Sequence, residues 1–327
     1  MKTLFISHPH QMKKEELPPT VMALGYFDGI HLGHQKVIRT AVQIAAEKGY
    51  KSAVMTFHPH PSVVLGKKDK HVHLITPLKK KEQLIGELGI DYLYIVEFTS
   101  SFAQLFPQEF VDQYIIGLHV KHVVAGFDFT YGRLGKGTME TLPFHSREQF
   151  TQTVIPKLSI DGEKISSTYV RQLLKNGDVD QLPRLLGRFY EVEGTVVGGE
   201  RRGRTIGFPT ANIALKDDYL LPALGVYAVK VKIGSDIFEG VCNVGYKPTF
   251  HSTREGLPSI EVHIFDFAKD IYGETMTIEW HMRLRSEQKF AGVDELIAQI
   301  QRDKEKAQAY FRNFAETTCI LSQKEVF

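Results

Sequence analysis

The sequence predicts an N-terminal α/β domain built on a parallel sheet, followed by an antiparallel β domain that ends in a helix. In the first half, short apolar runs alternate with longer amphipathic ones. In the second half, short β-rich runs are separated by Gly and Pro. The chain has 327 residues, enough for two domains of roughly 150 residues each. We place the boundary near residues 183–188, which divides the chain into 1–183 and 184–327.

The first half contains the alternation of strand and helix that is typical of a parallel sheet with helices on both faces. Apolar residues at helical spacing predict a helix over 33–48, which should end at Gly49. A second helical segment is expected over 107–118. The predicted strands are 20–27, 52–57, 92–96 and 122–125. Ligands of such sheets bind outside the carboxyl ends of the strands, so those ends are where a site is expected.

The second half has a different pattern. A short helical stretch over 178–186 ends at Gly187, and closely spaced β-rich runs begin at Tyr190. Such runs predict either an antiparallel barrel or a sandwich. Apolar residues on one face of 293–311 predict a terminal helix packed on this β structure. A peptide-binding amphipathic helix is the alternative for that segment.

The composition indicates an ordinary globular protein, with 43% hydrophobic and 24% charged residues. The net charge of +2 provides no overall electrostatic attraction for nucleic acid or for an anionic membrane. Two cysteines, Cys242 and Cys319, exclude a disulfide framework, and we expect reduced thiols. No apolar run has the length of a signal peptide or a membrane span, so a cytoplasmic location is expected.

Two further clusters of polar residues receive simple interpretations. The histidine pairs at 8/10, 58/60 and 71/73 have no further ligands at metal spacing, so a zinc site is not expected there. The run Lys79-Lys80-Lys81 is interpreted as the solvated face of a helix.

The segment GYFDGIHLGH, residues 25–34, joins the first strand of this alternation to its first helix. Gly25 and Gly29 allow a tight turn and a close approach to a ligand. His31 and His34 lie at the helix N-terminus, where free N–H groups and the helix dipole favour an anion. Two imidazoles at this position suit a phosphate that gains charge during transfer. The alternative is a plain strand–helix turn with surface histidines.

In this position the His-x-Gly-His motif resembles the nucleotidyltransferase superfamily, and the full string resembles its FAD synthetase branch. The resemblance implies that His31 and His34 bind the ATP phosphates and stabilise the transition state. It also places Gly25, Phe27, Asp28, Gly29 and Gly33 in the nucleotide site.

Three downstream segments support the same resemblance: TFHPHP at 56–61, GFDFTYG at 126–132 and ISSTYVR at 165–171. The first two contribute His60 and Asp128 to the expected binding site. Hydroxyl groups at a helix start, followed one turn later by an arginine, are suited to clamping a phosphate. A simple helix cap is the alternative for this third segment, whose expected site residues are Ser166, Ser167, Thr168 and Arg171.

A second motif, RGRTIGFPTAN, occupies residues 202–212. Gly203 and Gly207 allow a flexible loop, and Arg201, Arg202 and Arg204 make it basic. Thr210 and Asn212 place two neutral oxygen ligands on one face of an extended chain, and such ligands suit Mg²⁺ carried in with ATP. A basic hairpin or a nucleic-acid-binding patch is the alternative.

This second motif resembles the flavokinase family, which implies that Thr210 and Asn212 hold Mg-ATP. NVGYKPTF at 243–250 resembles another segment of that family. SIEVHIFD at 259–266 places the family's catalytic carboxylate at Glu261. RLRSEQKF at 283–290 places Arg285 and Glu287 on the flavin side. An edge-strand glutamate that faces water is the alternative for Glu261.

Together the resemblances run from about residue 20 to about residue 312 and indicate the bacterial bifunctional riboflavin kinase/FMN adenylyltransferase (FAD synthetase) family. This family would phosphorylate riboflavin with ATP to give FMN, and then adenylylate FMN to FAD with release of pyrophosphate. The implied ligands are riboflavin, FMN, ATP and Mg²⁺, with no nucleic-acid or membrane partner, and the oligomeric state stays open. Two alternatives are another adenylyl- or cytidylyltransferase whose barrel only binds, and a non-enzymatic RNA-binding barrel.

Overall fold

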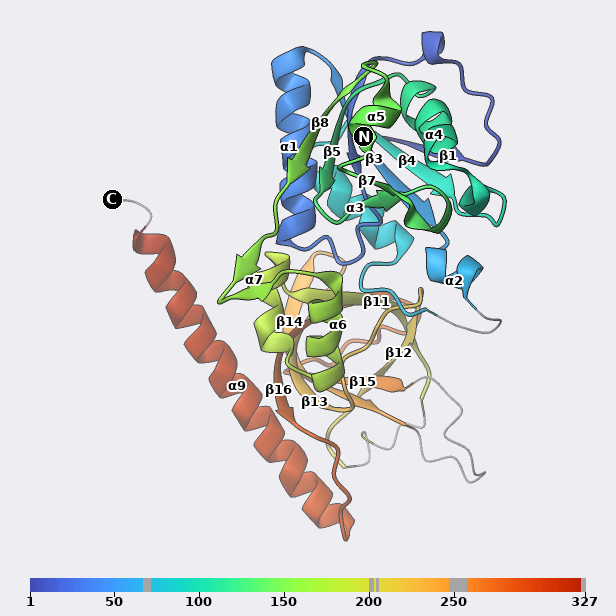
Figure 1. The fold of residues 1–327 in the computed structure, drawn as a ribbon. Coiled ribbons are helices and arrows are strands. Elements are labelled where there is room, and N and C mark those ends of the chain that lie inside the picture. Colours follow the sequence, from blue (N-terminus) through green and yellow to red (C-terminus); the bar gives the residue numbers. More distant parts are fainter. Residues whose placement is uncertain (67–71, 200–202, 204–205, 247–257, 325–327) are drawn as a thin grey trace. The chain divides into compact units, whose positions relative to one another are not determined.

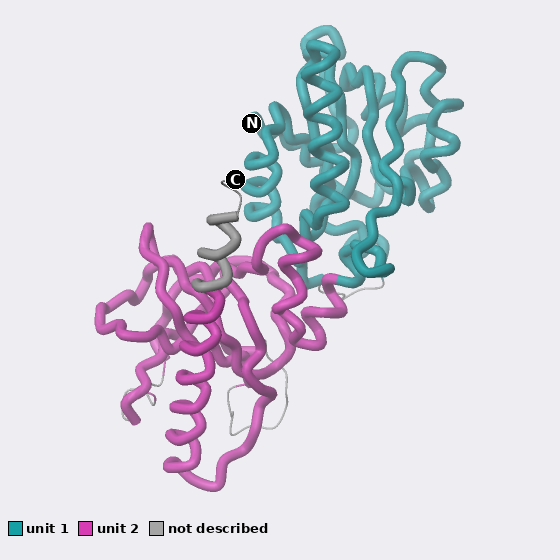
Figure 2. The backbone as a smooth tube through the Cα atoms, turned by 90° about the vertical axis from the view of Figure 1, so that its left-hand side faces the viewer, with its two compact units in different colours: residues 1–169 teal, residues 170–327 magenta. Residues whose placement is uncertain are grey.

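The computed structural model describes residues 1–66, 72–199, 203, 206–246 and 258–324, with side chains up to residue 314. Backbone contacts divide the chain into a first unit, Met1–Tyr169, and a second unit, Val170–Phe327 (Figure 2). Each unit has its own buried apolar core.

The first unit is built on a six-stranded sheet in which all neighbouring strands are parallel (Figure 1). Its order is β1-β4-β3-β2-β5-β8. The strands are β1 (Lys2–Ile6), β2 (Thr20–Leu24), β3 (Lys51–His58), β4 (Tyr92–Glu97), β5 (Val120–Gly126) and β8 (Thr151–Ile155). The predicted parallel α/β architecture is confirmed.

Helices cover both faces of this sheet. α1 (Leu32–Lys48) and α3 (Leu78–Glu87) pack on one face, and their apolar residues share a core with β2, β3 and β4. α4 (Pro107–Phe110) continues as a π-helix (Val111–Ile116) and packs on the other face. The remaining short strands and α-helices of the unit are β6 (Thr130–Tyr131), β7 (Gly137–Thr138), β9 (Ser159–Ile160), β10 (Glu163–Lys164), α2 (Pro61–Leu65) and α5 (Leu142–Ser146).

The chain order reverses beside β2. From β2 the chain runs outward through β3 and β4, and it then returns to the other side of β2 as β5. Such a reversal leaves a crevice outside the carboxyl ends of the strands, because the connections diverge to opposite sides. The segments that follow β2, β3 and β5 therefore meet at this edge, and they carry the motifs at 25–34, 56–61 and 126–132.

The second unit is a closed six-stranded antiparallel barrel (Figure 1). Because the sheet closes on itself, the second unit is a barrel, and the sandwich alternative is excluded. α6 (Ser167–Asn176) crosses the division between the units, and α7 (Leu182–Leu186) follows it. In barrel order the strands are β11 (Tyr190–Val197), β12 (Ala211–Leu215), β15 (Ser259–Ile264), β14 (Asp236–Gly245), β13 (Gly225–Ile233) and β16 (Thr275–Arg285).

The terminal helix α9 (Val293–Lys324) packs on the barrel, as predicted. Ala307 and Phe311 are buried against Val226, Ala228 and Leu284. The helix begins at the predicted residue and extends beyond the predicted end at 311. Among the described residues, no helix combines the length and apolar character needed to cross a membrane.

Candidate active sites

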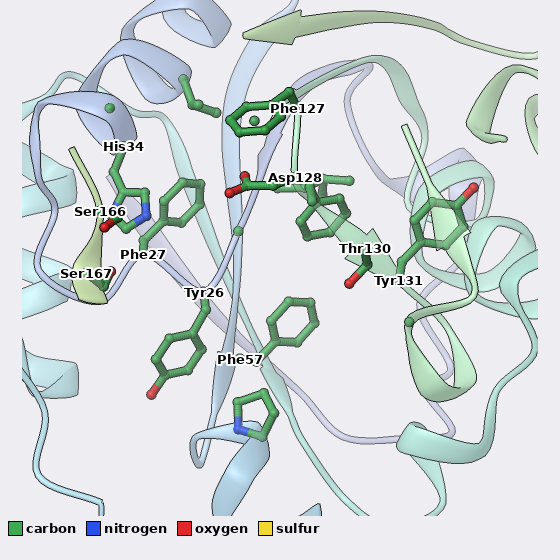
Figure 3. Close-up of a pocket in the computed structure, with 18 of the residues that line it drawn as sticks. Tyr26, Phe27, His34, Phe57, Phe127, Asp128, Thr130, Tyr131, Ser166 and Ser167 are labelled. Carbon is green, nitrogen blue, oxygen red and sulfur yellow. The ribbon is translucent and has the colours of Figure 1, made fainter. Parts of the chain in front are cut away.

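A cavity of about 640 Å³ opens at the carboxyl edge of the parallel sheet. Figure 3 shows side chains from the turns after β2 and β5 and from the start of α6 around it. Most of the site residues predicted for the first domain line this cavity: Gly25, Phe27, His31, Gly33, His34, Asp128, Ser166, Ser167 and Thr168. The fold thus brings together residues that lie as much as 143 positions apart, from Gly25 to Thr168.

The two histidines of the first motif form a stacked pair at the start of α1. His31 is the N-cap residue, and its Nδ1 accepts a hydrogen bond from the backbone N–H of His34 at 3.2 Å. The ring centroids are 3.6 Å apart, with 19° between the planes. A histidine at this position therefore replaces the usual Ser, Asp or Asn cap.

Burial keeps both histidines neutral near pH 7. It lowers the pKa of His31 from 6.5 to about 4, although Asp128 opposes the shift. Burial also lowers the pKa of His34 well below its usual value, and the charges of His31 and Lys81 act in the same direction. Since Nδ1 of neutral His31 accepts a hydrogen bond, its proton resides on Nε2. His31 can therefore donate a hydrogen bond to a phosphate oxygen without being charged.

The turn between β2 and α1 is held by contacts within the motif and with the segment before α3. A Cβ on Gly25 would lie 2.7 Å from the ring of Phe27, so a larger residue there would displace that ring. The Phe27 ring in turn meets His34 edge-on, with centroids 5.2 Å apart. Asp28 is 4% exposed, and its carboxylate accepts a hydrogen bond from the Thr76 N–H at 2.9 Å. Asp28 and Gly29 shape this turn and are not among the described residues that line the cavity.

The start of α6 lies beside the turn between β2 and α1 at one end of the cavity. The Ser166 hydroxyl caps the helix by accepting a hydrogen bond from the Tyr169 N–H at 3.2 Å. The Ser167 hydroxyl donates to the Asp28 carbonyl at 2.7 Å. The helix start is thereby tied to the turn after β2. Arg171 lies four residues after Ser167 on α6, within the second unit, and its predicted role in the first site stays a prediction.

Lys164 is a cavity residue that the sequence analysis missed. Its ammonium pairs with the Asp128 carboxylate and lies 4.7 Å from the centroid of the Phe127 ring. The pair joins the turn after β5 to the segment before α6. No spacing rule singles out a lysine two residues before a helix cap, so only the fold shows that it faces Asp128.

The other end of the cavity is aromatic. Figure 3 places Thr130 and Tyr131 on the side of the view opposite His34, Ser166 and Ser167. Five rings line this part of the cavity and pack on one another as well: Phe57, Phe98, Phe102, Phe110 and Tyr131. A large planar ring system would bury its faces well against such a wall.

His60 has a different position from its expected place in the nucleotide site. It is the N-cap of α2, where its Nδ1 accepts a hydrogen bond from the Ser62 N–H at 3.1 Å. Its ring packs edge-on against Tyr26, with centroids 4.4 Å apart. Pro61 lines the cavity, whereas His60 is not among the described lining residues.

The interpretation of residues 79–81 as a solvated face is wrong for Lys81, which is only 2% exposed. Its ammonium donates to the Tyr26 carbonyl at 2.7 Å and lies 3.9 Å from the centroid of the Tyr26 ring. The spacing of Leu78, Lys81 and Ile85 gives the physical reason. Residues three and four apart share a helical face, and this face packs on the sheet.

The second unit has a cavity of about 790 Å³ on the outer side of the barrel. It is lined by the loop before β12, the neighbouring strands β14 and β15, the segment after β16, and α9. Five of the residues predicted for the second site line it: Gly203, Thr210, Glu261, Arg285 and Glu287. Gly207 and Asn212 are not among the described lining residues.

The loop before β12 turns tightly at Gly203. The Phe208 N–H donates to the Gly203 carbonyl at 2.8 Å, and a Cβ on Gly203 would lie 2.2 Å from the Phe208 carbonyl oxygen. The same hypothetical Cβ would lie 3.5 Å from the Thr210 hydroxyl, so the loop and this hydroxyl are close together. Arg201, Arg202, Arg204 and the last four residues of the segment NVGYKPTF, 247–250, lie outside the described residues.

Glu261 lies in the middle of the barrel wall. Its register partners are Asn212 on β12 and Asn243 on β14. Both edges of β15 are thus paired, and the alternative of an edge-strand glutamate is wrong. The strand alternates, with Ile260 and Val262 buried and Glu261 partly exposed toward the cavity.

An ion pair with Asp303 of α9 holds Arg285 at the wall of this cavity. The Arg285 Nε contacts the two carboxylate oxygens of Asp303 at 2.9 and 3.2 Å. Asp303 is 4% exposed and also accepts a hydrogen bond from Gln299. Sequence reasoning missed Asp303, because its partner lies 18 residues earlier on a different element.

Comparisons with known proteins match each unit to a different family. A family model described as FAD synthetase matches residues 13–169, and one described as riboflavin kinase matches residues 186–311. A curated bifunctional riboflavin kinase/FMN adenylyltransferase from Bacillus subtilis (strain 168) is 55% identical over 313 residues, covering 96% of this chain and 99% of the relative. The protein of the same name from Listeria monocytogenes is 47% identical over 311 residues, covering 95% and 98%.

A solved structure has a similar fold over nearly the whole chain. It is a crystal structure named as that of a macrolide-efflux protein from Streptococcus pneumoniae, with a TM-score of 0.83 and 36% sequence identity. The match covers 94% of this chain and 99% of that one. Identity above 30% over almost the full length of curated relatives, together with both family models, shows that the chain belongs to the bifunctional riboflavin kinase/FMN adenylyltransferase family.

Proposed function

We propose that this chain makes FAD in two steps, with riboflavin kinase activity in the second unit and FMN adenylyltransferase activity in the first. The observation that carries the proposal is that each unit has its own cavity, and that each cavity is lined by residues of the motif that its family model covers. The efflux activity in the name of the S. pneumoniae protein is not carried over, because both family models and the curated relatives name flavin enzymes.

In the adenylyl step, the FMN phosphate attacks the α-phosphorus of ATP and pyrophosphate leaves. The attacking group is already an anion, so the site needs no strong base, and its task is alignment and stabilisation of charge. The neutral His31 donates through Nε2, and Gly33 in the first turn of α1 lines the same cavity. Ser166, Ser167 and Thr168 supply hydroxyl groups at the start of α6, and Arg171 would add a positive charge.

In the kinase step, the riboflavin 5′-hydroxyl attacks the γ-phosphorus of ATP, the bond from that phosphorus to the β-phosphate oxygen breaks, and ADP leaves. An alcohol is a weak nucleophile, so a carboxylate that accepts its proton late in the transfer lowers the barrier. Glu261 lies between two asparagines at a position where the strand is paired on both sides, which holds its carboxylate at the cavity wall. Arg285, held by Asp303, lines the same cavity and would orient the flavin.

The residues at the start of β12 suit Mg²⁺, which prefers oxygen ligands. Thr210 and Asn212 are separated by one residue in extended chain, and both offer a neutral side-chain oxygen. They would hold the ion against the ATP phosphates, where it neutralises negative charge. We propose this site from the donor chemistry and from the register of Asn212 opposite Glu261.

We propose the domain boundary 1–183 and 184–327, and we propose that a protein with these substrates acts in the cytoplasm. A fragment of residues 184–327 should convert riboflavin to FMN and form no FAD. A folded but inert fragment would contradict the assignment of the kinase to the barrel.

The full-length protein provides the direct test. Incubated with riboflavin and Mg-ATP alone, it should produce FMN and then FAD, separated by chromatography. Formation of neither product would refute the proposed function. Formation of FMN alone would refute the proposal for the first unit.

A further inference from the structure

Lys81 is a buried lysine that the proposed reaction does not yet use. It lies on α3, is 2% exposed, and points under the turn that joins β2 to α1. Nζ is 2.7 Å from the Tyr26 carbonyl oxygen and 3.4 Å from Oγ1 of Thr56. The Thr56 hydroxyl donates to the same carbonyl at 2.8 Å. Two donors from different elements thus converge on one peptide oxygen.

The Tyr26 carbonyl belongs to the peptide group that links Tyr26 to Phe27 in this turn. It directly precedes Phe27, whose φ of 56° is unusual for a residue other than glycine. The Phe27 ring fills the space over Gly25 and meets the His34 ring edge-on. Holding the Tyr26 carbonyl therefore holds Phe27, and Phe27 fixes one side of His34. The chain of contacts runs from a charge outside the cavity to a histidine that lines it.

Burying an ammonium is costly, and a fold rarely retains one without partners or a role. Here burial lowers the pKa of Lys81 to about 8, while Asp28 raises it. The other titratable groups that sense its charge are His34 on α1 and His58 on β3, whose pKa values it helps to lower. At pH 7 Lys81 is thus mostly protonated, while His34 beside it stays neutral.

We propose that Lys81 is a positioning residue of the adenylyltransferase site, whose positive charge holds the Tyr26 carbonyl and so keeps the turn and His34 in their reactive arrangement. A charged donor binds a carbonyl more strongly than a neutral amine does, so the arrangement depends on the proton. The inference rests on the proposed function of the first unit. It predicts that removal of the charge slows FAD formation and leaves the barrel's kinase activity intact.

The test compares Lys81→Met and Lys81→Arg with the wild type in the full-length protein, and Lys79→Met serves as the matched control. Lys79 lies two residues earlier on the same helix and is exposed, so the control removes the same charge at a solvent-facing position. With FMN and Mg-ATP, Lys81→Met should lower kcat by roughly 10- to 100-fold, the scale expected for misplaced reacting groups, and change both KM values less than about 3-fold. Lys79→Met should match the wild type.

The pH dependence of FAD formation distinguishes an effect of the Lys81 charge from an effect of side-chain packing alone. Wild-type kcat for FAD formation should fall above about pH 8, where Lys81 loses its proton. Lys81→Arg keeps its charge above pH 12, so its profile should lack this limb. If the larger guanidinium impairs the reaction at every pH, the wild-type profile decides, and a profile flat to pH 10 overturns the proposal.

Two further results would overturn the inference. One is near wild-type kcat in a folded Lys81→Met variant. The other is an equal loss of FAD formation and riboflavin phosphorylation, which would indicate general damage to the fold. A wild-type protein that makes no FAD from FMN would instead refute the proposed function itself.

Discussion

Acid should destabilise the first unit through His31. The side chain is 6% exposed, and burial lowers its pKa from 6.5 to about 4. Between these two pH values the unfolded chain binds a proton that the folded chain does not, so stability falls as the pH falls through this window. At roughly 1.36 kcal/mol per pH unit, the loss attributable to His31 reaches about 3 kcal/mol at pH 4.

His31→Asn tests this value, because asparagine is a good N-cap and can accept the same hydrogen bond from the His34 N–H. Urea unfolding of wild type and variant would be compared at pH 7 and pH 4. Far-UV circular dichroism follows both units, whereas fluorescence of Trp280, the single tryptophan, follows the barrel alone. The wild-type first unit should lose about 3 kcal/mol more than the variant on acidification.

An equal loss of unfolding free energy in wild type and variant would refute the reasoning. It would mean that His31 binds protons equally in the folded and unfolded states. The fluorescence transition serves as the internal control. It should be the same for both proteins at each pH.

Three further predictions concern single side chains. His34→Ala should lower FAD formation from FMN by roughly 10²–10³, the effect of one lost transition-state donor, while riboflavin phosphorylation stays normal in the same assay. Glu261→Gln should lower the kinase kcat by about 10² with little change in the riboflavin KM; near wild-type turnover would remove Glu261 from the role of base. Asp303→Ala removes the carboxylate partner of Arg285 and should cost the barrel about 2 kcal/mol, below the value for a fully buried pair because Arg285 is partly exposed. It should also raise the riboflavin KM several-fold, and an unchanged Trp280 unfolding midpoint would contradict the prediction.

The sequence was informative wherever function depends on a contiguous motif. The segment 25–34 combines a strand end, a turn and a helix start, so local chemistry alone placed His31 and His34 beside free N–H groups. The strands and the terminal helix were predictable for a similar reason, because apolar periodicity reflects which face is buried.

Contacts between distant segments could not be predicted in this way. Lys164 meets Asp128, and Asp303 meets Arg285, only because the fold brings separate elements together. Closure of the barrel depends on strand pairing, which no local pattern specifies, and it removed the edge-strand interpretation of Glu261.

Some motif residues proved to have structural contacts where binding was expected. Asp28 accepts a hydrogen bond from the Thr76 N–H, and His60 caps α2. A resemblance identifies which residues matter to a site, but not whether each one touches the ligand. Lys81 is the converse case, because a run of charged residues indicates a surface, whereas the spacing of the third lysine matches the buried face of the helix.

The central claim is that two independent sites act in sequence, and two single-site variants test it most directly. Each variant is incubated with Mg-ATP and either riboflavin or FMN, and the flavins are separated over time. His34→Ala should accumulate FMN from riboflavin with little FAD, and Glu261→Gln should make FAD from FMN at the wild-type rate while leaving riboflavin largely unconverted. Loss of both activities in either folded variant would contradict the account.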